Sequence, residues 1–219
     1  MTHYTEKKFN IPELKGISRK TVEEHLKLYA GYVKNVNAIY DKLAEYMEDS
    51  EKHALALAEL QRRFSFEWNG MRNHEYYFAS LEGGPRVMSG GASATNATNT
   101  LKAAIEAEFG SVEKWLATFK AIALTRGIGW AMLYWDKQVA DADSAGGANG
   151  QLGKLVHAWV DEQHLGQLNG AELVLGLDMW EHSYYLDYTP AEKKKYVEAC
   201  FENLNWGVVE KEFEIARGA

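Results

Sequence analysis

The sequence has a single cysteine, only three prolines and no long apolar run. The one cysteine, Cys200, cannot form an intramolecular disulfide, and its helix-like surroundings predict a small, buried side chain. No stretch approaches the ~18 apolar residues that a membrane-spanning helix needs, so we expect no membrane segment. The N-terminal residues are polar and lack the apolar core of a signal peptide or an Arg-rich transit pattern, which favours a cytoplasmic protein.

Basic residues are also fewer than acidic residues. The chain has 24 Lys and Arg against 31 Asp and Glu, which gives a formal net charge of -7 at pH 7. Surfaces that bind nucleic acid are basic, so this balance argues against a nucleic-acid partner. It also means that a small anionic substrate would need a local positive region. A chain of 219 residues is otherwise long enough to bury a substantial core.

Two long helices are predicted in the first half of the chain. Between residues 18 and 48, apolar and aromatic residues recur at spacings of three and four, the helical period. A second helical pattern runs from about Ser50 to Leu81, with Gly70 as a possible interruption. Two successive long helices joined by a short link predict an antiparallel hairpin.

A segment rich in Gly, Ser, Asn and Thr, Met88 to Thr100, predicts a loop between two domains. We place residues 1–90 in an N-terminal α-hairpin domain and residues 91–219 in a C-terminal α/β domain. Two short helices open this second domain, and a closing helix follows Pro190. Between them, three short aromatic or β-branched runs separated by Gly-rich turns, including residues 145–150, predict a three-stranded antiparallel sheet: Gly129 to Asp136, Lys154 to Glu162 and Ala171 to Asp178. The fold class is therefore α+β.

A carboxylate and an imidazole stand four residues apart in Asp178-Met-Trp-Glu-His182, directly after the last predicted strand. This spacing allows an oxygen and a nitrogen donor to bind one metal ion. The pair alone is a weak signal, but its aromatic neighbours predict a buried setting, in which an unpaired carboxylate would be costly. A bound cation is a natural partner.

Two further histidines could complete such a site. His25 shares one face of the first helix with Tyr29 and Tyr32, and His74 precedes aromatic residues on the second helix. Taken singly, each is as well explained by a packed core histidine. Convergence of both with Asp178 and His182 would give three imidazoles and one carboxylate, which suit a transition metal. The other histidines are assigned to the surface (His3, His53) or to packing within a strand (His157).

These residues resemble the iron/manganese superoxide dismutases. The matching segments are Asn73 to Phe78 (NHEYYF), Phe109 to Ser111 (FGS), Gly127 to Leu133 (GIGWAML), Asp178 to Tyr188 (DMWEHSYYLDY) and Asn205-Trp206. They extend over nearly the whole chain, and the D-x-W-E-H-x-Y-Y block is specific. The resemblance implies a superoxide dismutase that binds one metal ion per subunit through four ligands, with a solvent molecule as the fifth: His25, His74, Asp178 and His182.

The resemblance also bears on which metal is used. In the family, an outer-shell Gln hydrogen-bonds the metal-bound solvent and tunes the redox potential. Iron-type members carry this Gln four residues before the second His, where this chain has Gly70, whereas manganese-type members supply it from the strand region before the Asp. Here that region offers Gln163, with His164 as the alternative. Gly176 also fits the manganese type, so manganese is expected and iron is the alternative.

Other roles follow from the same resemblance. Tyr32 corresponds to the gateway tyrosine between solvent and metal, and Trp130 and Trp180 correspond to aromatic walls of the pocket. In the family, Glu181 and Tyr185 would cross a homodimer interface, Glu181 to hydrogen-bond His182 of the second subunit. This would give the Glu, which we expect to be buried, a partner.

The chain departs from the family pattern in its first helix. The family spacing H-x-x-x-H-x-x-x-Y is shortened to a tyrosine seven residues after His25, which predicts a regular helix without a π-bulge. Tyr29 replaces the second His of the pattern, which puts the family's hydrogen bond from that His to Tyr185 in doubt. The family's Arg after the Y-Y-L-D-Y block is missing, and Lys193 is the nearest substitute as the positive group.

Two other interpretations remain at this level. A catalytically weak metal-binding homologue would keep the four ligands but lose turnover through the changed first helix. A non-haem iron oxygenase needs two His and one carboxylate with open positions, and the fourth protein ligand argues against it.

Overall fold

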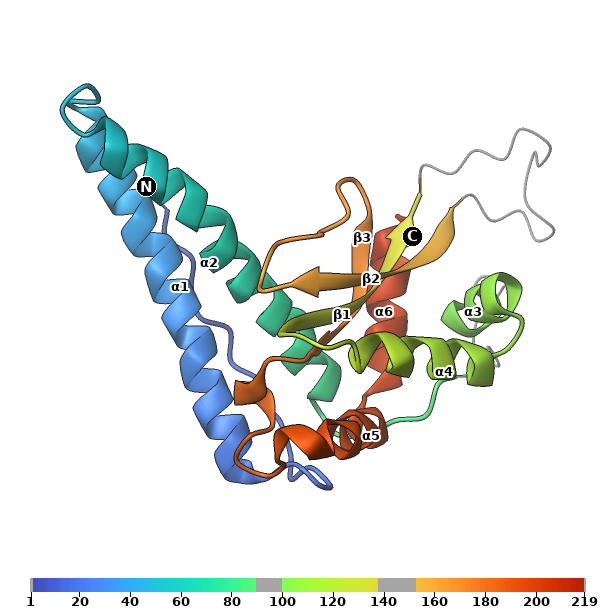
Figure 1. Ribbon diagram of the computed structural model, residues 1–219. Helices are drawn as coiled ribbons and strands as arrows, with labels where there is room; N and C mark the ends of the chain where they lie inside the picture. Colours follow the sequence, from blue (N-terminus) through green and yellow to red (C-terminus); the bar gives the residue numbers. More distant parts are fainter. Residues whose placement is uncertain (1, 90–99, 138–152, 219) are drawn as a thin grey trace.

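The computed structural model describes residues 2–89, 100–137 and 153–218. A long helical hairpin extends from an α/β body (Figure 1). The hairpin consists of α1 (Arg19–Met47) and α2 (Ala54–Leu81), which pack along each other. The body contains α3 (Leu101–Phe109), α4 (Val112–Ala123), β1 (Gly129–Asp136), β2 (Lys154–Asp161), β3 (Glu172–Asp178), α5 (Lys193–Asn203) and α6 (Trp206–Arg217). This arrangement confirms the predicted α+β class.

Local sequence explains how α1 begins and which face it buries. The Ser18 side chain caps the helix by accepting a hydrogen bond from the Thr21 amide. One apolar stripe of the helix is buried, and His25 and Tyr29 lie within it. The helix is α-helical from end to end, so the predicted regular helix without a π-bulge is confirmed. Tyr32 therefore lies almost two full turns beyond His25.

The second helix differs from its prediction in two details. It begins at Ala54 instead of Ser50, because turns over residues 48–53 connect the two helices. Gly70 does not interrupt it; the helix is continuous through this position. Helix α2 contacts β3, so the hairpin meets the sheet along the strand that ends at Asp178.

The three-stranded antiparallel sheet is confirmed, with the order β2-β1-β3. Its central strand, β1, is buried from Gly129 to Trp135. The register pairs Trp130 with Asp178, which fixes Asp178 beside an aromatic side chain at the end of β3. The strand ends differ from prediction by one residue: β2 stops at Asp161 and β3 starts at Glu172. The predicted turn at residues 145–150 and the boundary between residues 90 and 91 lie outside the described residues.

The closing helix is not one element. It divides into α5 and α6, with Leu204 extended between them. Asn205 causes the break: its side-chain oxygen accepts from the Gly207 amide and caps α6, while its side-chain nitrogen donates to the Glu82 carbonyl. The Asn205 amide also donates to the Ser80 carbonyl at 2.7 Å. The break thus ties the end of the chain to the end of α2. Within the described residues, no helix is both long and apolar enough to cross a membrane.

Candidate metal centre

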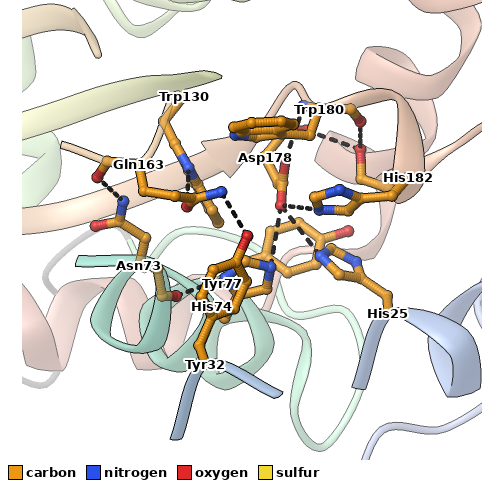
Figure 2. Close-up of polar contacts among 12 residues, drawn as sticks. His25, Tyr32, Asn73, His74, Tyr77, Trp130, Gln163, Asp178, Trp180 and His182 are labelled. Carbon is orange, nitrogen blue, oxygen red and sulfur yellow. Dashed lines mark hydrogen bonds and ion pairs between the residues drawn. The ribbon is translucent and has the colours of Figure 1, made fainter. Parts of the chain in front are cut away.

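Four predicted ligands converge where the hairpin meets the sheet (Figure 2). His25 comes from α1, His74 from α2, Asp178 from the end of β3, and His182 from the 3-10 turn Glu181–Ser183. The Nε2 atoms of His25, His182 and His74 lie 3.1, 3.3 and 3.5 Å from Oδ2 of Asp178. All four donor atoms lie within 4.8 Å of one another.

This donor set fits a single metal ion. Ligands held ~2.1 Å from one ion and separated by angles of ~90–120° lie ~3.0–3.6 Å apart, as the three imidazoles lie from Asp178. The Nε2 atom of His74 is fully buried and has no hydrogen-bond partner, which is costly unless a cation binds it. Three imidazoles and one carboxylate favour a transition metal over magnesium or calcium.

The ligands are held in the protonation states that metal binding needs. Burial lowers the pKa of His25, and burial together with the neighbouring His25 lowers the pKa of His74 to about 3. Both imidazoles are therefore neutral at pH 7, with nitrogen lone pairs free to bind. Burial alone would raise the pKa of Asp178, but the imidazoles of His182 and His25 outweigh it and hold that pKa below its usual range. Asp178 is thus a carboxylate although it is fully buried.

Backbone groups orient two of these ligands. Nδ1 of His74 donates to the Gly70 carbonyl at 2.6 Å, which leaves Nε2 directed at the other ligands. The second carboxylate oxygen of Asp178 accepts from the Trp180 amide at 2.8 Å. Both bonds are local, spanning four and two residues, so the sequence around each ligand determines its orientation.

Gln163 lies beside the ligands, in the connection between β2 and β3. It is fully buried, its Oε1 accepts from Trp130 Nε1 at 2.9 Å, and its Nε2 donates to the Tyr32 hydroxyl at 3.0 Å (Figure 2). The Asn73 side chain donates to the Gln163 carbonyl at 2.9 Å and holds the backbone at this point. The structure therefore brings Gln163, and not its neighbour, into contact with Tyr32.

His164 contacts Phe66 and has no described hydrogen bond to Tyr32. Its ring packs edge-on against Phe66, with 5.7 Å between the ring centres, and it is only partly buried. Of the two candidates left open by the sequence, Gln163 alone hydrogen-bonds to a residue of the pocket among the contacts described. The one-residue ambiguity arose because an irregular connection has no period by which sequence can assign facing residues.

Gly70 makes room for Tyr32. A Cβ atom at this position would lie 2.5 Å from the Tyr32 ring, closer than side chains approach one another. Because α2 is continuous here, Gly70 serves close packing and not a change of backbone direction. A glutamine at this position, as in the iron-type pattern, could not coexist with this placement of Tyr32.

Tryptophan rings flank the ligands on two sides. The Trp130 ring packs edge-on against His74 with 5.1 Å between ring centres, and the Trp180 ring stacks on His182 at 5.6 Å. Trp130 is fully buried, whereas Trp180 is partly exposed. These positions agree with the pocket walls expected from the family resemblance.

Three expectations need correction or refinement. Glu181 is exposed in the single chain, because the 3-10 turn that carries it lies at the surface. The predicted burial of its side chain is therefore wrong for the single chain. Tyr29, which replaces the second His of the family pattern, belongs to the core: its hydroxyl donates to Glu75 at 3.2 Å and accepts from the Lys7 amide. Lys193, the expected substitute for the family's Arg, donates from its ammonium to the carbonyls of Thr125 and Gly127, at 3.0 and 3.4 Å.

The remaining histidines and the cysteine are placed largely as predicted. His157 packs between aromatic rings, stacked on Phe109 with 4.6 Å between ring centres. His3 is exposed, while His53 is half-buried and stacks on Tyr46. Burial raises the pKa of the Cys200 thiol to about 12, which excludes a reactive thiolate at neutral pH.

The sequence matches two family descriptions that together cover most of its length. Residues 12–82 match the alpha-hairpin domain of iron/manganese superoxide dismutases, and residues 97–212 match their C-terminal domain. A superoxide dismutase [Fe] of Cupriavidus metallidurans is 36% identical over 89% of this chain and 87% of its own length.

Other relatives carry different metal names. The mitochondrial superoxide dismutase [Mn] of Aspergillus oryzae is 34% identical over 87% of this chain and 81% of its own length. A superoxide dismutase [Mn/Fe] of Propionibacterium freudenreichii is 32% identical over 89% of this chain and 87% of its own length. This chain is thus similar to proteins named for iron, for manganese and for both.

Proposed function

This chain belongs to the iron/manganese superoxide dismutase family and catalyses the dismutation of superoxide, and on that premise we propose that manganese is its working metal. The proposed ligands are His25, His74, Asp178 and His182. The observation that carries the proposal is the buried Gln163 at the Tyr32 hydroxyl, together with a Gly70 that has no space for a side chain. This is the arrangement that the family resemblance associates with the manganese type.

The metal preference matters because of the reaction's two halves. When bound, the metal supplies two oxidation states one electron apart, so that one superoxide loses an electron and leaves as oxygen and the next gains one and leaves as hydrogen peroxide. Asp178 is the one negatively charged ligand, and the three imidazoles are neutral. This balance of charge keeps both oxidation states of the metal accessible. Gln163 hydrogen-bonds within the same pocket, and groups at this position tune such a centre.

Proton delivery falls to Tyr32 and Gln163 in this proposal. Forming hydrogen peroxide from superoxide takes up two protons. The Tyr32 hydroxyl accepts from Gln163 Nε2, so its own proton is free to donate into the pocket. Burial, with the nearby charge of Asp178, raises the pKa of Tyr32, so the phenol keeps its proton at neutral pH. Tyr32 therefore keeps its proton until the strongly basic product of superoxide reduction takes it, and regains one from solvent.

We also propose that the protein works as a homodimer through Glu181 and Tyr185. Both side chains are exposed in the single chain, and Tyr185 is 57% exposed although it is large and aromatic. Glu181 immediately precedes His182, so a second copy docked on this surface would place the carboxylate of Glu181 within reach of the other copy's ligand. A carboxylate bonded to a ligand imidazole is a common way to orient it.

Metal analysis paired with activity tests the proposed metal. The protein is prepared metal-free, loaded separately with manganese and with iron, and each form is assayed for dismutation at matched metal content. We expect the manganese form to be the more active. A more active iron form overturns the manganese proposal. Negligible dismutation by both fully loaded forms favours the catalytically weak metal-binding homologue.

A further inference from the structure

Arg63 lies on α2, three turns before the ligand His74, and its guanidinium is held by two neighbours. Its Cζ atom lies 3.9 Å from the centre of the Phe66 ring. Its Nε donates to Oε1 of Glu67 at 2.8 Å, and Nη2 lies 2.8 Å from the same oxygen. The Arg63 side chain nevertheless remains 46% exposed. The guanidinium is thus both fixed in position and open to solvent.

Glu67 is the buried anchor of this pair. Its side chain is 4% exposed, and its second carboxylate oxygen accepts from Asn35 Nδ2 at 3.1 Å. A buried carboxylate without a cation would be costly, so Glu67 and Arg63 stabilise each other. Because the donors come from both helices of the hairpin, the pair keeps its place relative to the pocket.

Phe66 connects this cation to the metal centre. The ring centres of Tyr32 and Trp180 lie 6.1 and 6.5 Å from that of Phe66. We call these three partly exposed side chains the aromatic rim (Tyr32, Phe66, Trp180). On its inner side, Tyr32 packs against His74 and Trp180 stacks on His182 (Figure 2). Arg63 lies over the ring of Phe66, the third member of the rim.

The electrostatics agree with this placement. Arg63 is a cation over the Phe66 ring, whose neighbours are Tyr32 and Trp180. The chain as a whole carries a net charge of -7, which repels an anion. Lys193, the lysine nearest the family's missing Arg, is half-buried, and its ammonium is engaged by two carbonyl oxygens.

We propose that Arg63, anchored by Glu67, is the cation that draws superoxide to the aromatic rim, in place of the arginine that this chain lacks after its Y-Y-L-D-Y block. The inference rests on the dismutase activity and adds a guiding residue to it. Arg63 does not contact the metal ligands; it raises the local concentration of the anion at the entrance. Its effect must therefore weaken as salt screens the charge.

The test compares Arg63→Gln with Lys42→Gln. Lys42 is a matched control: it pairs with Glu45 at 2.7 Å and lies 5.5 Å over the Tyr46 ring, but near the outer end of α1. Both variants change the net charge by one unit. For Arg63→Gln we expect kcat/KM to fall ~2- to 10-fold at ~0.01 M salt, with the difference lost by ~0.3 M. For Lys42→Gln we expect the wild-type salt dependence.

Two further variants test whether Arg63 attracts superoxide or only neutralises the charge of Glu67. Arg63→Lys keeps the charge and is expected to retain most of the rate at low salt. The double variant Arg63→Gln/Glu67→Gln removes both charges and leaves no buried carboxylate unpaired, so it guards against misfolding. We expect the double variant to stay slower than wild type at low salt. A double variant as fast as wild type overturns the proposal, because Arg63 would then only offset Glu67.

Azide binding to the metal-loaded protein, followed by visible absorption, gives a readout that does not depend on turnover. We expect Arg63→Gln to weaken binding of this monoanion at low salt, with metal content and melting temperature unchanged in the double variant. Equal azide affinity and equal salt dependence in all variants overturn the proposal while leaving the dismutase assignment intact. A wild-type protein without activity would contradict the assignment itself, and azide binding would still test Arg63.

Discussion

The side-chain amide of Gln163 donates to the hydroxyl of Tyr32 at 3.0 Å, joining two residues that are 131 positions apart in the chain. Gln163 comes from the sheet side of the molecule and Tyr32 from the hairpin, so their bond spans the interface at which the metal ligands meet. Trp130 holds the other end of the same amide at 2.9 Å. A fully buried amide bonded at both ends cannot rotate freely, and Tyr32 is held in place with it.

Replacing Gln163 tests this connection. We expect Gln163→Ala to keep its metal, since the four ligands are untouched, but to lose activity by about 10- to 100-fold. Gln167→Ala is the control: Gln167 lies four residues further on and bonds Asn73 at 3.3 Å and the Gln163 carbonyl at 3.4 Å, but none of its described bonds reaches the Gln163 side chain or Tyr32. Metal content and dismutation rate are measured on both. An active Gln163→Ala variant with unchanged metal selectivity would contradict the proposed role.

Glycine-to-alanine substitutions in the two hairpin helices are expected to have opposite effects. Gly31 in α1 has open space around a Cβ atom, so Gly31→Ala should stabilise the fold by about 0.5–1 kcal/mol through helix propensity. At Gly70 the added atom would lie 2.5 Å from the Tyr32 ring, so Gly70→Ala should destabilise by about 1–3 kcal/mol. Thermal unfolding of both metal-free variants checks the signs. Stabilisation by Gly70→Ala would mean that Tyr32 moves freely.

Much of this site could be predicted from sequence because its parts are local. Asp178 and His182 stand in one short motif at a strand end, and the helical periods of α1 and α2 place His25 and His74 on buried faces. The family resemblance assigns all four residues to one metal site. The break between α5 and α6 was not predicted, although Gly207 lies near it, because the break depends on hydrogen bonds from Asn205 to residues over 120 positions away.

Other features depend on how distant elements pack. A spacing of three residues on one helix places Arg63 over Phe66, but no pattern within the sequence places Phe66 beside Trp180, since that contact arises only when α2 meets the end of the sheet. Tyr29 is the converse case. Its spacing places it on the same helix face as His25 and Tyr32, but its hydroxyl bonds Glu75 and the N-terminal segment. Helical periodicity predicts a shared face broadly, not which of two adjacent tyrosines lines a pocket.

The proposed homodimer gives a prediction for Glu181. Because this carboxylate is exposed beside the ligand His182, we expect Glu181→Ala to shift the protein toward monomer and to reduce metal retention during dialysis against a chelator. Glu24→Ala is the control, since Glu24 is an exposed carboxylate of α1 that pairs only with Lys27 among its described contacts. Sedimentation velocity at several concentrations measures the association. A wild-type protein that sediments as a monomer throughout would rule out this dimer.

His157 should make the fold less stable in acid. Burial lowers the pKa of His157 to about 4, against about 6.5 in an unfolded chain. Between these values the unfolded chain binds a proton that the folded protein does not. Stability is therefore lost as pH falls from about 6.5 to about 4 and is unaffected by this residue above that range. The loss should be about 1–2 kcal/mol, since the ring is only partly shielded from solvent.

His157→Phe should remove this loss while keeping the stacking on Phe109. We expect the metal-free variant to show a smaller fall in melting temperature than wild type between pH 6.5 and about 4.5. His53→Phe is the matched control, because His53 also stacks on an aromatic ring, Tyr46, with 4.4 Å between ring centres, but at the hairpin turn. Its pH dependence should follow that of wild type. If His157→Phe does so too, a buried neutral imidazole at this position does not limit the acid stability of the fold.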